Sequence, residues 1–137
     1  RFPEALDACS RAVALDPARG DARINHALAL LALGRALEAK TEFDSVLAVR
    51  SNSPEALVNR GLACMVLGQA EEAMSSYRQA LEIEPNNAEA HNVMGVALAR
   101  SGRRDEALAH FERAVRLAPE NAEYSDNLRI CRDGSPM

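Results

Sequence analysis

Similar residues recur every 34 positions along this 137-residue chain, and this period constrains the fold more than any other feature. Five groups of turn-forming, small or aromatic residues share it. They are Gly34, Gly68 and Gly102; Pro17, Ser51, Pro85 and Pro119; Ala5, Ala39, Ala73 and Ala107; Cys9, Phe43, Tyr77 and Phe111; and Ala12, Val46, Ala80 and Ala114. Each unit carries two amphipathic segments separated by a glycine. A repeat of this length built from paired helices predicts a solenoid, in which each unit packs on its neighbours and the stack presents an extended surface.

Turn and capping residues mark where helices are expected to begin and end. The periodic glycines suit the left-handed backbone position that terminates a helix. Asn87 and Asn121 are expected N-caps, and each precedes a glutamate in the first turn, where the helix dipole favours negative charge. Ser53 is expected to cap another helix, with Pro54 at its first position.

Two further glycines, Gly61 and Gly95, fall inside predicted helices. A glycine there costs about 1 kcal/mol relative to alanine. We therefore expect the second helix of the same repeat to pass too close for a side chain. The small residues Ala73 and Ala107 are expected to form the facing surface.

The repeat resembles the tetratricopeptide repeat. When the proline position is numbered 32, full repeats begin at Gly20, Pro54 and Ala88. The family has a large residue at positions 4 and 11, Leu at 7, Gly or Ala at 8, Ala at 20 and 27, an aromatic residue at 24 and Pro at 32. At these positions the second repeat carries Leu57, Arg60, Gly61, Cys64, Ala73, Tyr77, Ala80 and Pro85. The third repeat carries His91, Met94, Gly95, Leu98, Ala107, Phe111, Ala114 and Pro119. The first repeat is a weaker match, with Arg23, His26, Ala27, Leu30, Ala39, Phe43, Val46 and Ser51.

This resemblance implies an all-α fold, a right-handed superhelical solenoid of antiparallel helix pairs, as a single domain over residues 1–137. We expect a half repeat at 1–19, full repeats at 20–53, 54–87 and 88–121, a capping helix at 122–132 and a tail at 133–137. Arg129 and Arg132 stand where a following helix would pack, which favours the capping role. The chain begins within a repeat, so we expect a fragment of a longer array. Its first helix is expected to expose an apolar face, including Phe2, through which the chain could self-associate.

Composition argues against several classes of partner. The net charge is −4, and the chain has no basic stripe of the kind that nucleic-acid binding requires. The longest apolar run, residues 27–33, is far shorter than a membrane span. Three cysteines without paired spacing favour a reducing compartment, which predicts a cytoplasmic protein and leaves a periplasmic or secreted fragment open. The Ala- and Arg-rich composition is compatible with a bacterial source.

The residue types needed for catalysis or metal binding are present without the necessary spacing. The candidates are Cys9, Cys64, Cys131, His26, His91 and His110. They form no Cys-x-x-Cys, His-x-x-x-His or His-Glu-x-x-His motif, and core packing explains Cys9 and Cys64. The single, periodic glycines indicate turns rather than a phosphate-binding loop. We therefore expect no catalytic residue, no metal, no cofactor and no enzyme activity.

In the family that the repeat resembles, positions 2, 5, 6, 9, 12 and 13 of the first helix line a concave groove. Here positions 5, 9 and 12 are mainly apolar, position 2 is acidic, and position 6 reads Asn25, Asn59, Val93 and Asn127. The candidate groove residues are Asp21, Ile24, Asn25, Leu28, Glu55, Val58, Asn59, Leu62, Met65, Glu89, Asn92, Val96 and Arg100. Asparagine both donates and accepts hydrogen bonds, so it can hold a peptide backbone. The acidic residues either attract basic ligands or only stabilise helix starts.

These features predict a protein–protein interaction scaffold that binds a peptide or helix in its concave groove. The partner is expected to be another protein or peptide segment, not nucleic acid or membrane. Binding of a C-terminal carboxylate, as in one subfamily, is disfavoured because the positions that would hold it are apolar except Asn92. The asparagines resemble the asparagine ladder of O-linked N-acetylglucosamine transferase. The alternative function is therefore the substrate-selecting arm of a larger enzyme, such as a glycosyltransferase.

Overall fold

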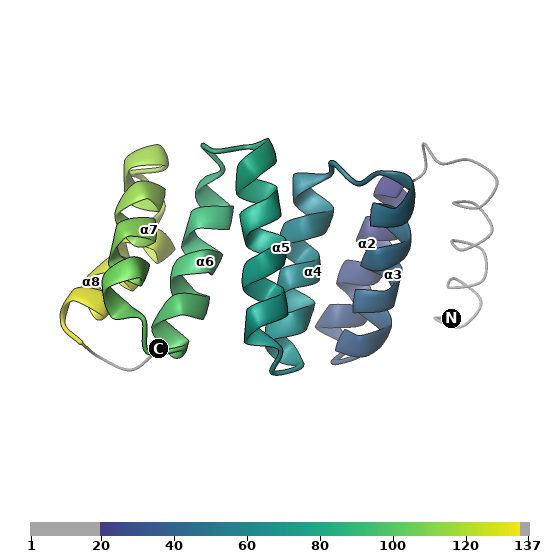
Figure 1. Ribbon diagram of the computed structural model, residues 1–137, viewed down its shortest axis with the longest axis horizontal. Coiled ribbons are helices and arrows are strands. Elements are labelled where there is room, and N and C mark those ends of the chain that lie inside the picture. The colour runs from purple at the N-terminus through teal and green to yellow at the C-terminus, as the bar shows by residue number, and fades with distance from the viewer. Residues whose placement is uncertain (1–19, 135–137) are drawn as a thin grey trace.

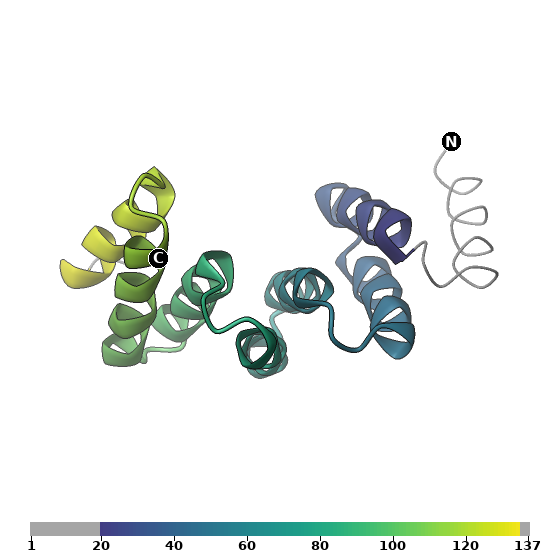
Figure 2. The ribbon, with the colours of Figure 1, turned by 90° about the horizontal axis from the view of Figure 1, so that it is seen from above.

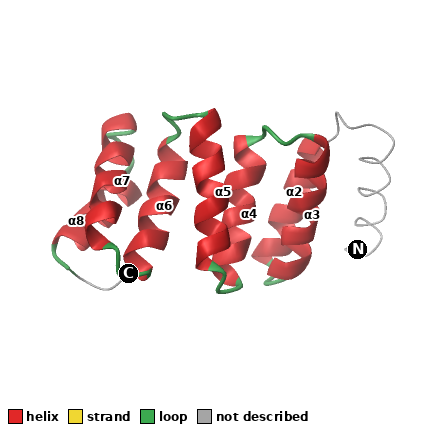
Figure 3. Cartoon of the chain, viewed as in Figure 1, coloured by secondary structure: helices red, strands yellow, loops and turns green. Residues whose placement is uncertain are grey.

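The computed structural model describes residues 20–134, and within this range only helices and their connecting turns occur (Figure 3). The helices are α2 (Gly20–Ala32), α3 (Ala36–Val49), α4 (Pro54–Val66), α5 (Ala70–Ile83), α6 (Ala88–Arg100), α7 (Arg104–Leu117) and α8 (Ala122–Arg132). The half repeat at 1–19, the self-association expected through it and the end of the tail at 135–137 lie outside the described residues. No helix in the described range is long and apolar enough to cross a membrane.

Consecutive helices pack as pairs, and the pairs stack in chain order. α2 packs on α3, α4 on α5, and α6 on α7, while α3–α4, α5–α6 and α7–α8 contacts join the pairs. Figure 1 shows the helices standing side by side along the long axis, and Figure 2 shows from above how successive pairs follow one another. Further contacts link α2 to α4, α4 to α6 and α6 to α8. The predicted all-α solenoid of helix pairs is therefore confirmed.

The predicted helix ends are confirmed at the level of single residues. Gly34, Gly68 and Gly102 have φ values of 81°, 77° and 80°, which L side chains rarely adopt. The side chains of the three predicted N-caps accept a hydrogen bond from the backbone N–H three residues later. These are Ser53 with Ala56 at 3.2 Å, Asn87 with Ala90 at 2.9 Å, and Asn121 with Tyr124 at 3.1 Å.

The close approach at the two helical glycines is confirmed, and aromatic rings lie nearest to them. A Cβ atom on Gly61 would lie 2.2 Å from Cε1 of Tyr77, and one on Gly95 would lie 2.7 Å from Cε1 of Phe111. The nearest atoms thus belong to the aromatic rings of Tyr77 and Phe111, whereas the sequence pointed to Ala73 and Ala107 as the facing residues. An aromatic ring reaches farther from its own helix than a methyl group does, so it occupies the space that glycine leaves.

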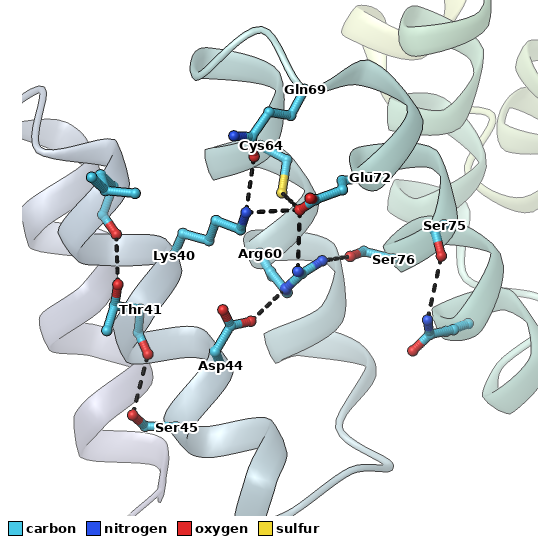
Figure 4. Close-up of polar contacts among 12 residues, drawn as sticks. Lys40, Thr41, Asp44, Ser45, Arg60, Cys64, Gln69, Glu72, Ser75 and Ser76 are labelled. Atoms are coloured by element: carbon cyan, nitrogen blue, oxygen red, sulfur yellow. Dashed lines mark hydrogen bonds and ion pairs between the residues drawn. The ribbon is translucent and has the colours of Figure 1, made fainter.

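Position 7 of the second repeat carries Arg60 in place of the leucine typical of the family. Its guanidinium group donates to Asp44 of α3 at 2.5 Å, and to Ser76 and Glu72 of α5 at 2.7 and 3.3 Å (Figure 4). Lys40 of α3 reaches the same Glu72 carboxylate at 2.7 Å. We call these five residues the Arg60 network. It joins the first repeat to the second through charge-assisted hydrogen bonds, which are stronger than neutral ones.

The first repeat has a related arrangement around His26, its own position 7. Arg23 donates to both carboxylate oxygens of Glu42, at 2.5 and 3.2 Å, and His26 Nδ1 lies 3.9 Å from the same carboxylate. All three side chains are largely buried. Arg60 and His26, the two polar residues that replace leucine at position 7, therefore each lie beside a carboxylate from a neighbouring helix.

Candidate functional site

A groove of about 590 Å3 lies along the first helices of successive repeats. Its walls come from α4, α6 and α8, with one residue each from α2 and α5. The lining residues are Leu31, Leu62, Met65, Val66, Tyr77, Asn92, Val93, Val96, Arg100, Glu123, Asn127 and Ile130. The contacts between alternate helices bring these residues together, because they place α4, α6 and α8 next to one another.

Five of the predicted groove residues line this groove: Leu62, Met65, Asn92, Val96 and Arg100. They come from the second and third repeats, at positions 5, 9, 12 and 13. Residues of the first repeat do not line it, apart from Leu31 at position 12. The first repeat therefore contributes little to this groove.

The other predicted residues are not among those that line the groove. Asp21, Asn25 and Glu55 are exposed, Leu28 packs against the core of the first repeat, and Glu89 lies in the first turn of α6. Three of these are buried: Ile24 at 1 %, Val58 at 2 % and Asn59 at 8 % exposure.

The burial of Ile24 and Val58 corrects the expectation that position 5 forms an exposed apolar wall. Ile24 packs within the core of the first repeat, and Val58 packs with Leu57, Ala80 and Ala90. Ala90 belongs to α6, so the next repeat contributes to covering Val58. Only in the third repeat does position 5, Asn92, line the groove.

Some groove residues were not among the predicted ones. Leu31, Val93, Glu123 and Asn127 stand at groove positions 12, 6, 2 and 6, which the periodic pattern identifies, although they were not among the candidate residues. Tyr77 occupies the aromatic position of the second helix, which the family pattern assigns to packing. Val66 and Ile130 also stand at groove positions, 13 and 9, so the same periodic pattern could have found them.

The two edges of the groove carry opposite charge. Burial raises the pKa of the Glu89 carboxyl group, and the charges of Glu123 and Glu55 raise it further, which indicates that these three carboxylates lie near one another. Arg100 lies in the last turn of α6, eleven residues after Glu89, or about 16 Å along the helix. Arg100 makes no hydrogen bond or ion pair with residues 20–134. The groove is thus acidic where α4, α6 and α8 begin and basic where α6 ends.

Besides Arg100, two groups in the groove have hydrogen-bonding capacity left. Asn127 Nδ2 donates to Asn92 Oδ1 at 2.9 Å, and this arrangement leaves the Asn92 NH2 group as a donor. The Tyr77 hydroxyl is buried and has no hydrogen-bond partner among the described residues. Burial raises the pKa of Tyr77 far above its ordinary value, so the hydroxyl stays protonated.

The described residues offer little else for chemistry. In residues 20–134 no three His, Cys, Asp or Glu side chains are grouped so that they could hold a metal ion. Cys64 and Cys131 are buried and free, and burial raises the pKa of both thiols. Both therefore remain in the weakly reactive thiol form at neutral pH.

Three family models match the chain, and together they account for most of the described residues. They are a TPR repeat over residues 61–102 and tetratricopeptide repeats over residues 88–121 and 20–45. The chain belongs to the tetratricopeptide repeat (TPR) family. No sequence among the curated proteins matches it.

Solved structures of TPR proteins share the fold at low sequence identity. MamA superposes with a TM-score of 0.84 at 17 % identity, over 97 % of this chain and 78 % of that chain. The second TPR domain of human RPAP3, in complex with an HSP70 peptide, has a TM-score of 0.78 at 20 % identity, over 85 % and 98 %. The Yersinia enterocolitica secretion chaperone SycD, in complex with a peptide of the translocator YopD, has a TM-score of 0.75 at 16 % identity, over 83 % and 92 %. At these identities the likeness establishes the fold alone.

Proposed function

We propose that the groove binds a short peptide segment of another protein, so that this TPR domain acts as an interaction scaffold. The groove itself carries the proposal, because half-buried apolar side chains such as Leu62, Met65 and Val96 gather along its walls. Large apolar side chains on a concave surface usually mark an interaction site. Two of the similar structures, RPAP3 and SycD, hold peptides, which supports a peptide as the class of ligand.

The charges at the two edges indicate what the peptide carries. A lysine or arginine would be favoured beside Glu89 and Glu123, and an oxygen acceptor would be favoured beside Arg100. The edges lie about 16 Å apart along α6, which an extended peptide spans with about five residues. Between these polar ends the peptide would place apolar side chains against Met65 and Val96. Affinity should be micromolar or weaker, because a groove this small buries little surface.

The test uses a synthetic dodecamer peptide selected from a random display library against the whole chain. Its affinity is measured by fluorescence anisotropy for the unaltered protein and for two charge variants. Met65→Glu places a charge in the apolar part of the groove and should abolish binding. Arg78→Glu changes an exposed residue of α5 outside the groove lining and should leave binding intact.

The reverse result would overturn the proposal. If Arg78→Glu removes binding and Met65→Glu does not, the peptide binds another face of the solenoid. Circular dichroism of both variants checks that each remains folded. The alternative, a substrate-selecting arm of a larger enzyme, would use the same groove, and no feature of residues 20–134 favours it.

A further inference from the structure

The Tyr77 hydroxyl is an unusual group in this fold. The side chain is 0 % exposed, and its oxygen has no hydrogen-bond partner within residues 20–134. A buried hydroxyl without a partner is unfavourable, because it has given up its hydrogen bonds to water. The hydroxyl is therefore a cost to the free protein, and its presence calls for a reason other than stability.

The neighbouring repeats show that packing does not require this hydroxyl. Phe43 and Phe111 occupy the same repeat position, and both are also 0 % exposed. Phe111 lies against Gly95 as Tyr77 lies against Gly61. Tyr77 and Phe111 thus fill equivalent space, and the oxygen atom is what distinguishes them.

The position of Tyr77 connects the hydroxyl to the groove. Tyr77 lines the groove, and Met65, Val93 and Val96 both line it and pack against the core cluster that contains Tyr77. The close contact with Gly61 restrains the ring, and with it the direction of the hydroxyl. Met65 has three rotatable side-chain bonds, so it can move aside to admit a ligand atom.

We propose that the Tyr77 hydroxyl donates a hydrogen bond to an oxygen atom of the peptide segment that occupies the groove, and so contributes to its specificity. This inference rests on the peptide-binding function proposed above. The other unused polar groups on this part of the groove, the Arg100 guanidinium and the Asn92 NH2 group, are also donors. The ligand that satisfies all three presents oxygen acceptors, from its backbone carbonyls or from an acidic side chain.

The first test needs no ligand and compares the free protein with Tyr77→Phe. Because the hydroxyl has no partner, its removal should leave the Tm unchanged or raise it. A reproducible fall in the Tm would show that the hydroxyl already has a partner in the free protein, such as an ordered water, and would overturn the proposal. The matched variant Phe111→Tyr adds a hydroxyl at the equivalent position and serves as the comparison for the size of the effect.

The second test uses the same selected dodecamer. Tyr77→Phe should weaken its binding roughly fivefold to tenfold, the change expected for one lost hydrogen bond. If Met65→Glu abolishes binding but Tyr77→Phe binds as tightly as the unaltered protein, the groove function stands and this inference fails. If Met65→Glu leaves binding unchanged, the groove function itself fails.

A third arm identifies the oxygen atom. Each acidic residue of the dodecamer is replaced by alanine, and each peptide is measured against both the unaltered protein and Tyr77→Phe. A carboxylate partner is shown if one replacement removes the difference between the two proteins. A backbone carbonyl is shown if the difference persists for every peptide. Either result supports the proposal once the fivefold to tenfold loss is observed.

Discussion

The two sides of α4 meet different surroundings. On one side Arg60 finds Asp44, Ser76 and Glu72 within 3.3 Å, and it joins two repeats. On the other side Leu62 and Met65 are only half-buried, and they line a groove in which polar groups lack partners. Polar groups are therefore satisfied where the repeats are held together and are left available where a ligand would bind.

This difference separates stability from binding. A residue of the Arg60 network should affect the free energy of unfolding and leave peptide affinity alone. A residue of the groove should do the reverse. Tyr77 belongs to both, because it packs in the core cluster and also lines the groove.

The largest effect is expected at Gly61, because both stability and peptide binding depend on its contact with the Tyr77 ring. Gly61→Leu should lower the free energy of unfolding by about 3 kcal/mol or more, because even a Cβ atom would lie 2.2 Å from the Tyr77 ring. It should also weaken peptide binding, since it displaces the ring that lines the groove. Chemical denaturation measures the first effect and fluorescence anisotropy with the selected dodecamer measures the second.

Two matched variants sharpen this prediction. Gly95→Leu should destabilise less, because the corresponding distance to Phe111 is 2.7 Å. Gln79→Leu, on the exposed side of α5, should change stability little. If Gly61→Leu were as stable as the unaltered protein, the close contact between α4 and the Tyr77 ring would be disproved.

A smaller loss should follow from breaking the Arg60 network alone. Arg60→Ala should destabilise by about 1–2 kcal/mol, because Ser76, only 1 % exposed, loses the partner of its hydroxyl. Lys40 still neutralises Glu72, which limits the effect. Peptide affinity should not change, so thermal denaturation and anisotropy should respond differently. The control is Arg129→Ala, because Arg129 is 68 % exposed and its ion pair with Asp126 should contribute less than about 0.5 kcal/mol.

Periodicity alone predicted the fold because each repeat reuses the same local signals. The positive φ of Gly68 and the N-cap at Asn87 follow from residues within a few positions along the chain. The Arg60 network could not be predicted in the same way. Its partners lie on α3 and α5, 12 to 20 residues away, and position 7 is ordinarily apolar.

The groove was predicted only in part, because repeat positions do not specify how neighbouring repeats are angled. Met65 and Val96 were predicted from their positions and line the groove. Val58 has an equally favourable sequence signal, yet packing with Ala90 of the next repeat helps bury it. Tyr77 could have been noticed as the tyrosine among phenylalanines at one repeat position, but its unpaired hydroxyl is visible only in the structure.

A third region, between α6 and α7, holds two histidines that should give the protein a pH dependence near neutral pH. His91 Nε2 lies 2.8 Å from the Pro85 carbonyl oxygen, which can only accept, so Nε2 carries a proton. His91 Nδ1 then accepts from His110 Nδ1 at 3.1 Å, and protonating both rings would turn this contact into a repulsion between donors.

Burial lowers the pKa of both histidines below the ordinary value of 6.5, and Arg113 adds to the effect at His91 while Glu106 opposes it at His110. Below pH 6.5 the unfolded chain therefore binds more protons, and the free energy of unfolding should fall as the pH drops. The stabilisation is fully present above pH 6.5 and is lost as the pH falls through the lower folded-state pKa values. Thermal denaturation between about pH 7.5 and 5.5 should show a smaller loss for His110→Gln than for the unaltered protein. Equal losses in the two proteins would rule out the histidine pair as the source.

The smallest effect on stability is expected for Arg100→Ala. This variant is also the best control for Arg60→Ala. Both remove an arginine from the first helix of a repeat, but Arg100 makes no hydrogen bond or ion pair with residues 20–134. The free energy of unfolding should therefore change by less than about 0.5 kcal/mol. Binding of the selected dodecamer should weaken, and raising the salt concentration should weaken it less for Arg100→Ala than for the unaltered protein, because one screened charge contact is gone. A loss of stability as large as that of Arg60→Ala would show that Arg100 helps to hold the solenoid together, and the separation of the two sides of α4 would then not extend to α6.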